Sequence, residues 1–123
     1  MADFPENLKY TTEHEWLDES TPAVIGVTDV AAEALGDVVY LELPEVGATI
    51  EAGAVVGEIE STKSVSELYS PVSGTVTEVN TEAVANPEIV NQDPYGKGWL
   101  FKVEVSGSGE LLTAAEYAEH TGH

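Results

Sequence analysis

The sequence predicts a mainly β fold, a flattened barrel or sandwich that also contains short helices, one of them at the C-terminus. Short apolar and β-branched runs recur at close, regular spacing along most of the chain. Glycine, proline and other turn residues separate these runs, and only two stretches have helical composition and caps. Many short strands divided by turns are typical of β-barrels and sandwiches.

Residues 23–43 predict a strand, a helix and a second strand, in that order. Residues 23–27, AVIGV, are apolar and β-branched and predict a strand. In TDVAAEALGD, residues 28–37, Thr28 or Asp29 can cap a helix, and Gly36 stands where the helix should end. Residues 38–43, VVYLEL, alternate toward their end and stop before Pro44, so they predict the next strand.

The second half continues the β pattern. Further strands are predicted at residues 48–50, 55–59, 65–69, 74–79 and 100–105. The PVSG segment that ends at Gly74 predicts a turn, and we expect a positive φ at this glycine. Thr113 and Glu116 have the spacing of a capping box and predict the start of a C-terminal helix.

Length and charge limit the possible functions. With 123 residues the chain predicts a single domain over residues 1–123. It has 23 acidic residues and 4 lysines, a net charge of −19, and this excess should repel nucleic acids, anionic membranes and other copies of the chain. We therefore expect a monomer with neither nucleic-acid nor membrane partners. The N-terminal MADFPENLKY has no basic region and no apolar run, which predicts a cytoplasmic protein.

The acidity itself has two explanations. The acids could dock onto basic partner surfaces, or they could reflect adaptation to a salty cytoplasm, where screening shortens the range of self-repulsion. The acids are spread along the entire chain. This distribution favours salt adaptation.

Lys63 is the one candidate functional residue that the sequence motifs indicate. His14-Glu15-Trp16 begins like a zinc-protease motif, but position 18 is an aspartate, and the chain has no cysteine, phosphate loop or nucleophile elbow. We therefore predict neither catalytic residues nor a metal site. Lys63 lies between the strand-like runs 54–60 and 65–69, which places it at a hairpin tip. Taken alone, such a lysine could simply protect a sheet edge or pair with a neighbouring glutamate.

The surroundings of Lys63 resemble the attachment site of the biotinyl/lipoyl fold, in which the carrier lysine sits on an exposed hairpin tip. The pattern runs from VG at 46–47 through GEIE at 57–60 to SPVSGTV at 70–76. ESTKSVS, residues 60–66, resembles the H-protein family of the glycine cleavage system more narrowly. HEW, GVTD, ALGDVV, PYGKGW and LTAAEY resemble landmarks of that family in the same order, so the predicted core covers about residues 8–117.

The resemblance implies a lipoyl-type β fold and a carrier rather than an enzyme, with lipoate joined to Lys63 by an amide. It also implies four partners. They are a pyridoxal-phosphate glycine decarboxylase that loads an aminomethyl group, a tetrahydrofolate-dependent aminomethyltransferase that takes it, a flavin (FAD) dihydrolipoamide dehydrogenase that restores the disulfide, and a lipoate-attaching enzyme. Glu15 and Glu67 are the candidates for contacts with the ammonium group of the loaded arm; the alternative is that both are solvated surface acids.

Two other readings remain open at this stage. The chain could be a lipoyl carrier or relay for 2-oxo acid dehydrogenases, or an unmodified acidic β domain used for protein contacts. Intact-mass analysis after co-expression with a lipoate ligase separates the unmodified domain from the carriers. Activity with glycine decarboxylase then distinguishes among the carriers.

Overall fold

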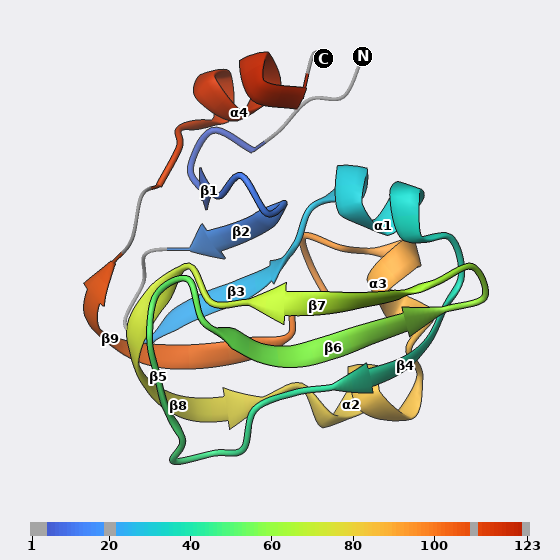
Figure 1. Ribbon diagram of the computed structural model, residues 1–123, viewed down its shortest axis with the longest axis horizontal. Helices are drawn as coiled ribbons and strands as arrows, with labels where there is room; N and C mark the ends of the chain where they lie inside the picture. The colour runs from blue at the N-terminus through green and yellow to red at the C-terminus, as the bar shows by residue number, and fades with distance from the viewer. Residues whose placement is uncertain (1–4, 19–21, 109–110, 122–123) are drawn as a thin grey trace.

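The computed structural model describes residues 5–18, 22–108 and 111–121, which form two antiparallel sheets and four short helices (Figure 1). The larger sheet has the order β1 (Lys9–Tyr10), β2 (Glu15–Asp18), β3 (Ala23–Val27), β9 (Phe101–Ser108), β8 (Val72–Val79) and β5 (Thr49–Ile50). The smaller sheet has the order β4 (Val38–Glu42), β6 (Val55–Ser61) and β7 (Val65–Tyr69). The predicted mainly β, two-layered fold is confirmed.

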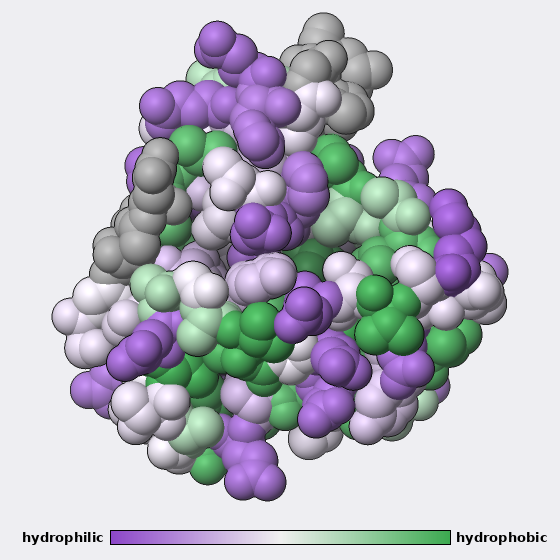
Figure 2. Space-filling model, in the orientation of Figure 1, coloured by the Kyte–Doolittle hydropathy of each residue, from purple (hydrophilic) through white to green (hydrophobic). Residues whose placement is uncertain are grey.

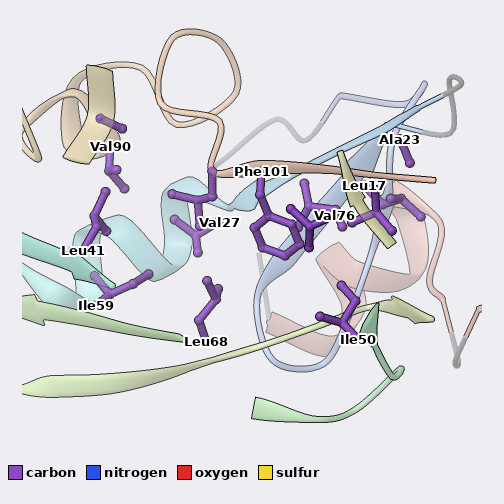
Figure 3. Packing of buried hydrophobic residues seen from close by; sticks show 14 of the residues in the cluster. Leu17, Ala23, Val27, Leu41, Ile50, Ile59, Leu68, Val76, Val90 and Phe101 are labelled. Atoms are coloured by element: carbon purple, nitrogen blue, oxygen red, sulfur yellow. The ribbon is translucent and has the colours of Figure 1, made fainter. Parts of the chain in front are cut away.

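The main core lies between the two sheets, where apolar side chains from both layers meet (Figure 3). Strand alternation explains which residues enter it. Leu41 of β4 is paired with Ile59 of β6, and both are buried, whereas the neighbouring pair of Tyr40 and Glu60 lies on the opposite face. The alternation seen in the sequence thus fixes the face that the small sheet turns toward the core.

A second, aromatic cluster lies beneath the C-terminal helix α4 (Ala114–Thr121). Its buried members are Leu8, Tyr10, Trp16, Ala114 and Tyr117. The rings of Tyr10 and Tyr117 are stacked, with centroids 4.9 Å apart. This cluster joins the last helix to the first two strands, on the same side of the molecule as helix α1 (Figure 1).

The caps of α1 (Asp29–Leu35) and α4 match the sequence. The hydroxyl of Thr28 accepts the Ala31 amide at 3.3 Å, and Gly36 ends α1 with a φ of 81°. At α4, the Thr113 amide donates to Glu116 at 2.9 Å and the Glu116 amide donates to the Thr113 hydroxyl at 3.2 Å. Both predicted helix starts are confirmed.

Some elements differ from the prediction. Strands β1 and β2 and helices α2 (Thr81–Ala85) and α3 (Ile89–Gln92) were not expected. The proposed turn conformation of Gly74 is wrong, because this glycine lies within β8 and does not have a positive φ. Its lack of a side chain serves close strand approach instead: a Cβ at Gly74 would lie 2.2 Å from the Glu104 carbonyl oxygen of β9.

Hydrophilic and hydrophobic residues are mixed over the face of the molecule seen in Figure 2. None of the described helices is long and apolar enough to span a bilayer.

Candidate functional site

The hairpin between β6 and β7 presents Lys63 to solvent. Ser61 organises this tip. Its amide and its hydroxyl both donate to the Ser64 carbonyl, at 2.8 and 3.1 Å, and the hydroxyl accepts the amides of Lys63 and Ser64 at 3.2 and 3.1 Å. The predicted position of Lys63 at the tip is therefore what the structure shows, and a serine side chain closes the turn.

The tip is also fixed from the side by the end of helix α1. The Thr62 amide donates to the Asp37 carbonyl at 3.0 Å. The Lys63 side chain runs past Gly36, where an added Cβ would lie 3.0 Å from the lysine Cδ. The positive φ of position 36 favours glycine, and the absence of a side chain there also leaves room for the aliphatic part of the Lys63 side chain.

A groove follows the free edge of β7, which is the outer strand of the small sheet. We call it the β7 groove. Its volume is about 260 Å³, and its walls are β7, helix α1 and the turn before β2. It begins beside the tip at Ser64 and reaches Glu15, where a second cavity of about 420 Å³ continues past Tyr69. Its lining on β7 extends from Val65 to Leu68, three steps apart, so the groove runs roughly 10 Å along this strand.

Glu15 is buried at the far end of this groove, with 2% of its surface exposed. Its carboxylate accepts a hydrogen bond from the Thr11 hydroxyl at 2.9 Å and one from the Tyr69 amide at 3.3 Å. Burial raises the pKa of Glu15 to about 8, and the nearby charge of Glu13 adds to this effect, although the two hydrogen bonds oppose it. Glu15 is therefore a desolvated acid that spans from β2 to the edge of β7, not a solvated surface group.

Glu67 has a different environment. It lies on β7, is exposed, and lines the β7 groove together with Glu15. Its partner across the sheet is Glu58, which in turn pairs with Glu42, so three acids cross the outer face in one row. The structure thus brings both predicted acids to one groove, one buried and one at its open side.

Sequence reasoning missed His14, Thr11 and Tyr117 as parts of this site. His14 lines the β7 groove and its Nδ1 lies 2.7 Å from the Tyr117 hydroxyl of α4. The two residues are 103 positions apart in the chain. The HEW motif and the final helix were each noticed, but no local pattern connects them.

A two-layered β domain that carries an exposed lysine on a rigid hairpin tip, next to a groove, has the architecture of lipoyl-type carrier domains. Proteins of this class transport a group; they do not catalyse a reaction themselves.

Comparison with known proteins identifies the family. The family model described as "Glycine cleavage H-protein" matches residues 8–123. Curated glycine cleavage system H proteins from Beutenbergia cavernae and Rubrobacter xylanophilus are 58% and 56% identical over 118 and 119 residues, covering 95% and 96% of this chain and 95% and 94% of theirs. A crystal structure of the H protein from Mycobacterium marinum has a TM-score of 0.94 at 50% identity and covers 98% of this chain and 100% of that one. The chain belongs to the glycine cleavage H-protein family and is a carrier component, not an enzyme.

Proposed function

We propose that Lys63 is the lipoyl attachment site, and that the chain shuttles the aminomethyl group from glycine decarboxylase to the tetrahydrofolate-dependent aminomethyltransferase and electrons to dihydrolipoamide dehydrogenase. The observation that carries this proposal is the geometry of the tip: an exposed lysine, held by Ser61 and Asp37, at the entrance of a groove that leads to a buried acid.

The surroundings of Lys63 fit lipoate. The tip is open enough for an attaching enzyme to reach the amine, and the hydrogen bonds of Ser61 and Thr62 fix where the arm begins. The β7 groove has both length and apolar walls, including Ala34 and Leu35, for a hydrocarbon arm. When attached, lipoate supplies a strained cyclic disulfide that opens readily to accept a carbon group and an electron pair. A tethered arm also presents its sulfurs to each docked partner at an effective concentration on the order of millimolar.

Glu15 and Glu67 support the loaded state in this proposal. An aminomethyl group carries a positive charge, and Glu15 is a desolvated acid whose ionised form a neighbouring cation would favour. Glu67 adds a second negative charge at the open side of the groove. Burial of the cation between them would also keep water from the carbon that is to be transferred.

The test uses intact mass and shuttle activity together. We expect Lys63→Ala to fold with a change in stability of at most about 0.5 kcal/mol, since the side chain is exposed, but to gain no lipoyl mass with a lipoate ligase and to carry no aminomethyl groups. Lys63→Arg should fail equally, because a guanidinium is a poor acyl acceptor. Lys97→Ala removes another exposed lysine and should behave as the wild type.

Full shuttle activity in Lys63→Ala would refute the proposal. Lipoylation of the wild type without activity toward glycine decarboxylase would favour the alternative, a carrier or relay for 2-oxo acid dehydrogenases. A wild type that never gains lipoyl mass would instead favour an acidic interaction domain.

A further inference from the structure

One atom of the C-terminal helix contacts two walls of the β7 groove. Tyr117 of α4 is fully buried, and its hydroxyl lies 2.7 Å from Nδ1 of His14 and 2.8 Å from Oγ1 of Thr28. His14 belongs to the turn before β2, and Thr28 is the N-cap of α1. Both the turn and the helix line the groove, so the Tyr117 hydroxyl links two of its walls.

The turn that carries His14 needs such a contact. His14 has a φ of 65° and is the one non-glycine residue with a positive φ among residues 5–18, 22–108 and 111–121. This backbone conformation is unfavourable for a residue with a side chain, so its neighbours must hold it in place. Its amide donates to the Thr11 carbonyl at 3.1 Å and its carbonyl accepts the Thr28 amide at 3.0 Å. Glu15 follows directly, so the position of its carboxylate depends on this turn.

Helix α1 extends from Tyr117 to the hairpin tip. Thr28, at one end, contacts Tyr117 and caps the helix; Gly36, at the other end, lies beside the Lys63 side chain, where an added Cβ would be 3.0 Å from Cδ. The seven residues between them span roughly 10 Å. Thr62 is tied to Asp37, the residue after the cap. The helix can therefore act as a strut between the C-terminal helix and the root of the arm.

We propose that Tyr117 is a positioning residue for the lipoyl arm: it holds the α1 strut and the His14 turn at a fixed separation from β7, so that the β7 groove retains the loaded arm. The role in retention rests on the proposed function; the role in holding α1 does not. Asn91 donates to the Gly36 carbonyl at 2.7 Å and keeps the far end of α1 attached to the fold. Loss of the Tyr117 hydroxyl therefore loosens the groove without dismantling it.

The first experiment measures amide hydrogen exchange by NMR in the unmodified protein. Tyr117→Phe keeps the ring that stacks on Tyr10 and removes only the hydroxyl. We expect the exchange rates of the Ala31 and Thr62 amides to rise roughly fivefold. This is the change in the opening equilibrium expected when the net contribution of one hydrogen bond is lost. Tyr40→Phe, the same chemical change at an exposed tyrosine, should leave both amides unchanged.

The second experiment measures how fast ammonia is released from the lipoylated carrier after loading with glycine and glycine decarboxylase. Tyr117→Phe should accelerate release several-fold while accepting lipoate as the wild type does. Tyr10→Phe is the control for a merely structural role: its hydroxyl donates to the Pro5 carbonyl at 2.7 Å, so its loss removes a different hydrogen bond from the same aromatic cluster. It should lower the melting temperature without changing release.

Unchanged exchange at Thr62 in Tyr117→Phe would overturn the strut. Equal release rates in Tyr117→Phe and wild type, or a release rate that follows the melting temperature in both tyrosine variants, would overturn the positioning role. A wild type that is not loaded at all would count against the proposed function alone, because the exchange result stands without the arm.

Discussion

Glu15 has both a structural contact and a proposed binding role. It is the buried acid that joins β2 to the edge of β7 through Tyr69, and it is also the candidate partner for the cation at the end of the arm. Burial of a carboxyl group without a cation favours its protonated form, which is why the pKa of Glu15 is raised to about 8. The unloaded protein should therefore be less stable when this group is forced to ionise.

This reasoning gives a dependence of stability on pH. An unfolded glutamate ionises near pH 4.3, so between about pH 4.3 and 8 the folded protein holds a proton that the unfolded chain has released. The free energy of unfolding should consequently fall as pH rises through this window. Glu15→Gln cannot ionise, so its melting temperature relative to the wild type should improve steadily from pH 5 to pH 8.

Thermal melts of both proteins across this pH range make the measurement. Glu104→Gln, a substitution of an exposed acid on β9, serves as the control and should run parallel to the wild type. Parallel curves for Glu15→Gln and wild type would mean that Glu15 is already ionised in the folded protein.

The sequence could predict some single residues and not others. Lys63 was predictable because its place depends on two flanking strands and a turn, all within a few residues. The burial of Glu15 was not, because it results from the approach of β7, whose Tyr69 is 54 positions away. The contact between His14 and Tyr117 joins the two ends of the chain and has no local signal.

At the scale of elements, the longer apolar runs became strands because their alternation matches a half-buried sheet. β1 and β2 are only two and four residues long, and KY and EWLD carry charged residues, so no pattern distinguished them from a loop. Helix α2 depends on Asn80, which caps it and also donates to the carbonyls of Lys97 and Trp99, at 2.8 and 2.6 Å. Such short elements form where tertiary contacts hold them, not where propensity alone would place them.

The approach of β8 to β9 gives a test at this scale. A side chain at Gly74 would collide with the Glu104 carbonyl and with a methyl group of Val103, 2.7 Å from the added Cβ. Since overpacking costs about 1–3 kcal/mol, Gly74→Val should lower the melting temperature by roughly 5 °C or more.

Gly107 is the matched control. It lies on β9 opposite Ser73, has no described atom within 4 Å of an added Cβ, and should accept valine with little change. Similar melting temperatures for Gly74→Val and Gly107→Val would show that the two strands can separate to make room.

At the scale of the whole molecule, the charge of −19 is almost uncompensated. Within the described part of the chain, the ion pair found is Lys102 with Glu78, at 3.6 Å, and both side chains are partly exposed. The row of Glu42, Glu58 and Glu67 places like charges directly opposite one another across the small sheet, which destabilises a sheet. Electrostatic repulsion among these acids therefore destabilises the folded protein, and screening by salt ions should reduce this repulsion.

This repulsion distinguishes the two explanations of the acidity. If the acids reflect salt adaptation, molar salt should raise the melting temperature of the isolated protein, since screening reduces repulsion among all the acids at once. If they form a docking face, salt should instead slow charge-steered encounter and weaken binding to partners. The decisive measurement is a series of melts and of affinities for the proposed partner, the aminomethyltransferase, over the same salt concentrations, with potassium and sodium chloride compared. We expect stabilisation to be the larger effect, because four lysines cannot neutralise 23 acids that are distributed along the whole chain. A constant melting temperature with a steep loss of affinity would establish docking as the reason for the charge.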